Sequence, residues 1–100
     1  LPPTIHAAYW PTFDIRPGRP VTFKVRSFRT TRPEEVWDFG DGSPPVTVHS
    51  DGNANVHSLD GYAVTQHAFA RPGDYVVTLR TTNQHGYTAT THLHVRVEQP

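Results

Sequence analysis

The stretch VWDFGDGSPP, from Val36 to Pro45, decides the fold of this chain. Trp37 and Phe39 alternate with Asp38, which is the period-two pattern of a β-strand with one buried face. Asp41 follows between two glycines, which permit the positive φ angles of a tight turn. Two prolines then stop the strand, because proline cannot donate a ladder hydrogen bond. The stretch therefore predicts a strand with Trp37 and Phe39 inward and Asp41 as a hydrogen-bonded turn residue.

Three further stretches alternate in the same way: PVTFKVRSF at 20–28, DYVVTLRTT at 74–82 and TTHLHVRVE at 90–98. The turn signals RPGRP, GDGSPP, RPGD and NQHG separate the alternating runs. No window has the 3.6-residue period of an amphipathic helix with caps. The pattern predicts an all-β antiparallel sandwich or barrel. We expect residues 1–100 to form one domain, with residues 1–15 supplying a linker and the first strand.

The shared phase of these runs predicts one core around Trp37. Its expected members are the inward residues of four strands: Phe23, Val25, Phe39, Tyr75, Val77, Leu79, Leu93 and Val95.

Composition excludes several functions. The chain has 100 residues, with nine Lys and Arg against nine Asp and Glu, so its formal net charge is zero. Nucleic-acid binding is therefore not expected, because phosphate contacts need a basic excess. The absence of cysteine excludes disulfides and zinc–thiolate sites. No apolar run is long enough for a membrane span, and no signal peptide is present. The first residue is Leu1, which suggests a module from a longer protein.

Three motifs together resemble the PKD domain, a module first described in the polycystic kidney disease protein. They are WDFGDGS at 37–43, HAFARPGDYVVTL at 67–79 and NQHG at 83–86. The resemblance covers about residues 16–98 and implies an immunoglobulin-like antiparallel β-sandwich of about seven strands. It also implies a noncatalytic spacer or adhesion unit of an exported protein, extracellular or at the cell surface. The residues that carry the structural motif are Trp37, Phe39, Gly40, Asp41, Gly42, Gly73 and Tyr75.

The chain departs from the family pattern in two loops. The connection between Ser43 and His67 is longer than usual, and the stretch SFRTTRPEE at 27–35 lacks the aspartate- and glycine-rich loop near which some members bind calcium. The long connection places Asp51, Asn53 and Asn55 at the spacing of calcium ligands, with Asp60 further on. The glycine and the bidentate glutamate of a calcium loop are missing, so a hairpin tip is the preferred interpretation. We expect no tight calcium site and no other cofactor.

Histidines and acids suggest two further hypotheses. His92 and His94 lie two apart on a strand, a spacing that suits zinc, although two solvated histidines are the preferred interpretation. Asp38 and Asp41 as a catalytic pair would need a pocket that a small sandwich rarely has. His67 is expected to make a local hydrogen bond rather than act as a base. We therefore expect no catalytic residues and no enzyme activity.

Aromatic and basic side chains are the candidates for ligand binding. Four aromatic residues lie outside the core pattern and could stack on sugars or on a partner: Tyr9, Trp10, Tyr62 and Tyr87. The preferred alternative is that Trp10 and Phe13 plug one end of the sandwich.

A second candidate surface is a stripe on the outer face of the predicted sheet. Its members are Arg80, His92, His94 and Arg96. An anionic polymer could bind there, but zero net charge favours an ordinary polar face.

The predicted function is that of an accessory module that spaces domains or contacts a polysaccharide, a protein polymer or a neighbouring domain. The alternatives are a calcium-stabilised linker, or a carbohydrate-binding module of an enzyme that degrades polysaccharide or protein.

Overall fold

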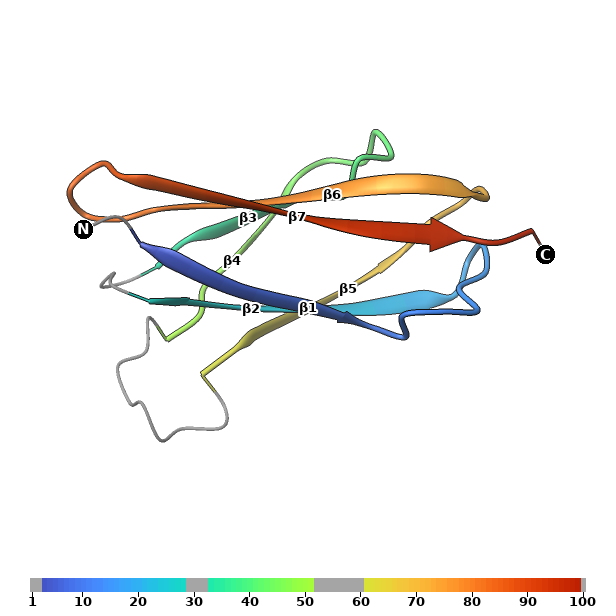
Figure 1. Cartoon of the computed structure of the whole chain (residues 1–100), viewed down its shortest axis with the longest axis horizontal. Helices are drawn as coiled ribbons and strands as arrows, with labels where there is room; N and C mark the ends of the chain where they lie inside the picture. The colour runs from blue at the N-terminus through green and yellow to red at the C-terminus, as the bar shows by residue number, and fades with distance from the viewer. Residues whose placement is uncertain (1–2, 29–32, 52–60, 100) are drawn as a thin grey trace.

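Two antiparallel sheets face each other in the computed structural model, which describes residues 3–28, 33–51 and 61–99 (Figure 1). Within these ranges there are seven strands and no helix. One sheet has the strand order β1–β2–β5 and the other β4–β3–β6–β7. The strands are β1 Thr4–Trp10, β2 Pro20–Phe28, β3 Glu35–Asp38, β4 Val46–Val48, β5 Ala63–Ala68, β6 Gly73–Thr82 and β7 Thr88–Val97. The prediction of an all-β sandwich of about seven strands is confirmed.

Pairing registers follow from the alternation of side chains. In the first sheet the inward Phe23 of β2 lies opposite Tyr9 of β1 and Thr65 of β5. In the second sheet Trp37 of β3 lies opposite Leu79 of β6. A shift by one residue would turn these side chains to the outer faces, so burial of one face determines the register.

Trp37 lies at the centre of the core with 0 % of its surface exposed. Its ring centroid is 5.2 Å from that of Phe23, and its ring stacks on Phe39 with centroids 5.9 Å apart. The predicted core is confirmed, with Tyr75 and Leu93 packed half-buried at its margin. Four further residues complete the buried cluster: Ile15, Val21, Phe69 and Val97.

One side of the sandwich is joined by contacts between β1 and β7. The Tyr9 hydroxyl donates to the backbone carbonyl of His94 at 2.7 Å. Ile15, in the segment after β1, forms an isolated parallel bridge with Val97 and accepts a hydrogen bond from the Glu98 amide at 2.8 Å. These contacts hold the segment after β1 against the end of β7.

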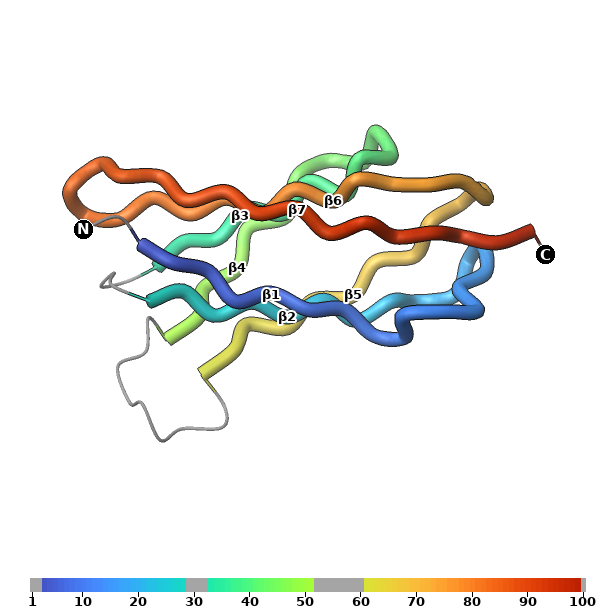
Figure 2. Tube along the Cα trace, viewed as in Figure 1, coloured from blue at the N-terminus to red at the C-terminus, as the bar shows by residue number. Residues whose placement is uncertain are grey.

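The molecule is elongated, with extents of 43 × 26 × 17 Å. The start of β1 and the end of β7 lie at opposite ends of the long axis (Figure 2). A chain that enters at one end therefore leaves at the other. Among the described residues no helix is long and apolar enough to cross a membrane.

Candidate functional site

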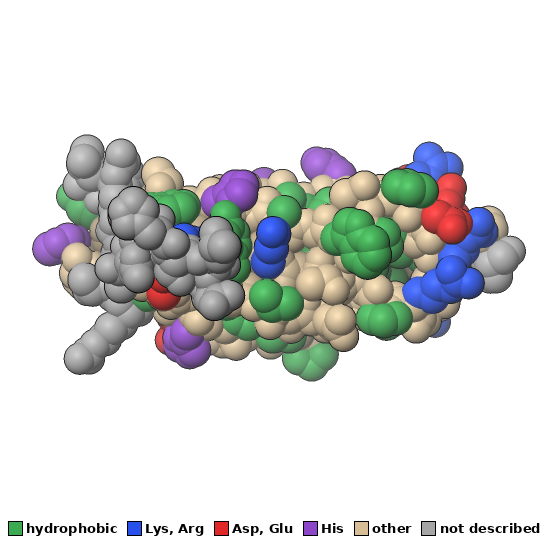
Figure 3. All heavy atoms as spheres, turned by 90° about the horizontal axis from the view of Figure 1, so that it is seen from below, with side chains coloured by type: hydrophobic (Ala, Val, Ile, Leu, Met, Phe, Trp, Pro, Cys, Tyr) green, Lys and Arg blue, Asp and Glu red, His purple; other side chains and the backbone are tan. Residues whose placement is uncertain are grey.

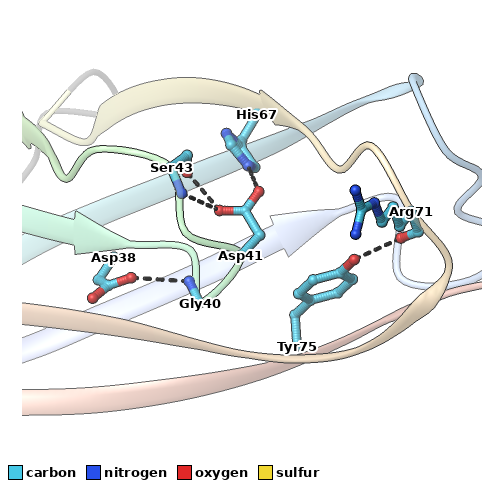
Figure 4. Close-up of polar contacts among 7 residues, drawn as sticks. All are labelled: Asp38, Gly40, Asp41, Ser43, His67, Arg71 and Tyr75. Carbon is cyan, nitrogen blue, oxygen red and sulfur yellow. Dashed lines mark hydrogen bonds and ion pairs between the residues drawn. The ribbon is translucent and has the colours of Figure 1, made fainter.

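The turn after β3 contains a polar cluster around Asp41, shown in Figure 4. Asp41 Oδ1 accepts hydrogen bonds from the Ser43 amide at 3.1 Å and from the Ser43 hydroxyl at 2.5 Å. Asp41 Oδ2 lies 2.6 Å from Nε2 of His67, which comes from β5 in the other sheet. The His67 ring stacks on Phe39 with centroids 4.0 Å apart. Asp41 therefore closes the turn and also joins the two sheets.

The same three side-chain types form the catalytic triad of serine hydrolases, but the order of contacts here is different. In a triad the serine hydroxyl contacts the histidine, which takes its proton, and the acid orients the histidine. Here Asp41 lies between the other two, and the Ser43 hydroxyl donates to Asp41 rather than to His67. The described contacts therefore differ from those of a triad, because the serine hydroxyl is bonded to the acid and not to the histidine. Asp41 accepts the backbone hydrogen bond expected of a turn residue, and its lack of a catalytic role stays a prediction.

Asp38 and Asp41 have separate hydrogen-bond partners in this turn. Asp38 Oδ1 accepts a hydrogen bond from the Gly40 amide at 2.9 Å and is exposed. The partners of Asp41 are instead Ser43 and His67. Each carboxylate thus stabilises its own part of the turn.

The pKa of Asp41 is lowered from 3.8 to about 2. Burial alone would raise this pKa, because it penalises the charged form. The hydrogen bonds from Ser43 and His67, together with the charge of His67, outweigh burial and favour the carboxylate. Because the folded pKa lies below the ordinary value, the unfolded chain binds the proton more readily. The resulting stabilisation is complete above about pH 4 and is lost as pH falls toward 2.

Replacing Asp41 with asparagine should remove this contribution, about 1–2 kcal/mol of unfolding free energy at pH 7. Urea unfolding at pH 7, 4 and 2.5 would measure it. We expect the wild type to lose stability relative to Asp41→Asn as the pH falls. Asp38→Asn is the matched control, because it makes the same change on an exposed carboxylate of the same turn. Parallel pH profiles for the wild type and Asp41→Asn would contradict the assignment.

A second structural contact lies at the start of β6. The Tyr75 hydroxyl donates to the backbone carbonyl of Arg71 at 2.7 Å. The Tyr75 ring packs on Phe69 with centroids 4.5 Å apart. This arrangement matches the tyrosine corner of immunoglobulin-like sandwiches, in which a tyrosine hydroxyl bonds to backbone a few residues upstream.

The predicted polar stripe lies on the outer face of β6 and β7. Arg80, His92, His94 and Arg96 are all exposed there. The cross-strand partners of the last three are Thr78, Val76 and Asp74. Among the described residues no group of three or more His, Cys, Asp or Glu side chains is placed to hold a metal ion. A ligand-binding role for this stripe stays a prediction.

The expectation that Trp10 and Phe13 plug the end of the sandwich is wrong. Trp10 is the last residue of β1 and is 73 % exposed, and Phe13 lies beyond the strand and is 78 % exposed. Phe69 and Ile15 occupy buried core positions instead. Tyr87 is also exposed, whereas Tyr9 packs half-buried against Phe23. Tyr62 is half-buried as well.

The structure describes only one of the four candidate calcium ligands, Asp51. Both carboxylate oxygens of Asp51 accept hydrogen bonds from Arg26, each at 2.9 Å. This bidentate pair engages the side chain that would be the first calcium ligand. The other candidates, Asn53, Asn55 and Asp60, lie outside the described residues. The expectation of no tight calcium site and no cofactor stays a prediction.

Two polar groups were missed by the sequence analysis. Glu35 is fully buried and accepts hydrogen bonds from the Ser27 hydroxyl at 2.5 Å and the Ser50 amide at 2.9 Å. Its period-two phase with Trp37 could have revealed that it points inward. Arg26 is buried although its phase is outward. No local sequence pattern reveals that Asp51 pairs with the Arg26 side chain.

The fold, the buried tryptophan and the tyrosine corner define an immunoglobulin-like sandwich module. The family model of the PKD domain matches residues 7–97. The chain therefore belongs to the PKD domain family, a family of noncatalytic modules that occur in larger proteins, some of them peptidases. PKD domains typically occur in extracellular or secreted proteins.

Two solved structures share this fold. One is the crystal structure of the PKD1 domain of Epp from Vibrio anguillarum, at 22 % identity and a TM-score of 0.66, covering 100 % of this chain and 98 % of that one. The other is the PKD domain of an M14-like peptidase from a Thermoplasmatales archaeon, at 16 % identity and a TM-score of 0.63, covering 96 % and 92 %. At these identities the likeness supports the fold alone. No match was found among curated proteins.

Proposed function

We propose that this chain is a noncatalytic accessory domain of an exported protein, and that it holds a polymer or partner protein against its outer surface. In this proposal residues 1–100 form one domain, and the location is extracellular or at the cell surface. Family membership supports the accessory role, because PKD domains are modules of larger proteins. Zero net charge supports a neutral partner rather than a nucleic acid.

The observation that carries the proposal is the exposure of Trp10 and Phe13. The inward positions of the sandwich are occupied by core side chains, so a ligand can only contact outer faces and loops. Figure 3 shows hydrophobic side chains spread over the outer face of the β1–β2–β5 sheet, with a cluster of charged side chains at one end. Exposed aromatic rings contribute large contact areas at low entropic cost. This surface supports contact with an extended polymer rather than with a small molecule.

The elongated shape supports a second role as a spacer. Because the described chain runs from one end of a 43 Å axis to the other, tandem domains would be held apart along it. A tethered module with weak affinity can also raise the local concentration of its ligand near a neighbouring catalytic domain. The two roles are compatible in one module.

A pull-down with insoluble polysaccharide and insoluble protein fibre tests the binding role. We expect the wild type to be retained on at least one of these solids and Trp10→Ala to be retained several-fold less, as for the loss of an aromatic anchor. Arg80→Ala combined with Arg96→Ala tests the outer face of β6 and β7, and Tyr87→Ala controls for loss of an exposed aromatic ring. Thermal melting should show intact folding of every variant.

Deleting the domain from its parent protein provides the second measurement. Activity of the parent on the solid should fall more than its activity on a soluble substrate. Equal retention of all variants, or no retention together with unchanged activity on the solid, would leave only the spacer role.

A further inference from the structure

A groove of about 400 Å³ lies at the end of β1, where the segment after this strand meets the start of β2. Most of its lining is apolar. Its exposed members are Trp10, Phe13, Asp14, Arg19 and Pro20, and Pro11 is half-buried beside them. The floor includes Ile15 and Val21, which belong to the buried core.

The groove has a fixed backbone although its aromatic rings are exposed. Trp10 pairs with Thr22 in the sheet, and Ile15 pairs with Val97 of β7. Phe13 lies between these two anchored residues. Its neighbour Asp14 adopts a positive φ of 56°, a turn conformation that aspartate tolerates. Two exposed rings on an anchored backbone form a preorganised binding surface, which lowers the entropic cost of association.

The polar groups of the groove are mainly hydrogen-bond donors. The carboxylate of Asp14 is paired with Arg16, with Oδ1 2.9 Å from Nε and 2.8 Å from the terminal nitrogen Nη2. Arg19 and Trp10 have side-chain donors that make no hydrogen bond or ion pair with the described residues. A ligand that offers acceptors and apolar rings would fit this combination. A sugar would also need acceptors for its many hydroxyl protons.

We propose that this groove, which we call the Trp10–Phe13 groove, binds a proline-rich segment of another protein in the polyproline II conformation. Proline has no backbone N–H, so such a segment presents carbonyl acceptors and apolar rings. Its helix has three residues per turn and no internal hydrogen bonds, and aromatic-lined grooves are its usual docking sites. The Asp14 carboxylate is paired with Arg16, which leaves the Arg19 guanidinium to donate to a backbone carbonyl of the ligand. The inference rests on the proposed function and names the chemical class of the polymer.

Two-dimensional NMR of the intact chain tests this assignment, because the sequence contains only two tryptophans and hence two indole N–H signals. Titration with decaproline should shift the Trp10 indole signal saturably, while the signal of the buried Trp37 stays in place. A glycine–serine decamer of the same length is the control peptide. No saturable Trp10 shift at millimolar decaproline, or an equal shift with the control peptide, would overturn the proposal.

Variants then locate the contact. Phe13→Ala should weaken decaproline binding by about tenfold or more, as for an aromatic anchor. Arg19→Ala should weaken it by about two- to fivefold, as for one hydrogen bond. Tyr87→Ala removes an exposed ring from the turn between β6 and β7 and should leave the affinity unchanged. This turn and the end of β1 lie toward opposite ends of the molecule (Figure 1). Equal affinity of Phe13→Ala and the wild type would place the peptide elsewhere.

The pull-down with insoluble polysaccharide distinguishes a failure of this inference from a failure of the proposed function. If Trp10→Ala lowers retention on polysaccharide while decaproline leaves the Trp10 indole signal unmoved, the groove is a sugar site. The proline-rich assignment is then overturned, and the proposed function stands.

Discussion

Replacing Trp37 with alanine should lower the free energy of unfolding by about 3–5 kcal/mol, the usual cost of truncating a large core aromatic. The side chain is fully buried, so its removal leaves a cavity and also reduces the apolar area that is buried on folding. Its neighbours Phe23 and Phe39 would lose their ring contacts. For a domain of this size each kcal/mol corresponds to about 4–8 °C, so the melting temperature should fall by at least about 12 °C.

Urea and thermal unfolding would measure this loss, and Trp37→Phe provides the matched control. Phenylalanine keeps an aromatic ring and removes the indole N–H, which has no hydrogen-bond partner among the described residues. We therefore expect Trp37→Phe to be clearly less destabilised than Trp37→Ala. A Trp37→Ala variant that melts like the wild type would contradict the central position of this residue.

Gly40→Ala should also be strongly destabilising, by about 2–5 kcal/mol. Gly40 has a φ of 74°, a left-handed conformation that costs an alanine about 1–2 kcal/mol. A Cβ atom at this position would also lie 2.4 Å from the backbone carbonyl oxygen of Val76 in β6. Because backbone cannot rotate away as a side chain can, the turn or β6 would have to shift, which adds about 1–3 kcal/mol.

Gly42→Ala separates these two contributions in the same turn. Gly42 has a similar φ of 86°, but a Cβ atom there would have no heavy atom within 4 Å. We expect this variant to lose only the conformational part, about 1–2 kcal/mol. Equal melting temperatures for Gly40→Ala and Gly42→Ala would show that contact with β6 does not require glycine at position 40.

Local patterns were sufficient for strands β2, β3, β6 and β7 and for the part of the core that these strands supply. Trp37 and Leu79 were predicted inward from period-two alternation, because successive side chains of a strand point to opposite faces whatever the tertiary structure. The turn at Asp41 could also be predicted from the sequence, because its hydrogen bond to the Ser43 amide joins residues only two positions apart. Such features depend on neighbours in sequence. The family motifs then identified the sandwich among the all-β folds that this pattern allows.

The sequence by itself therefore determined which side chains point inward and where the chain turns, but not which distant residues meet. The partner of Asp41 is His67, and the partner of Arg26 is Asp51; the sequence separations are 26 and 25 residues. These contacts depend on how the loops lie over the sheets. For Trp10 the sequence left two possibilities, ligand contact or a plug at one end of the sandwich, and the plug was preferred because large aromatic residues usually bury their surface. Only the tertiary structure placed it at an exposed strand end, because the core volume there is already filled by Ile15 and its neighbours.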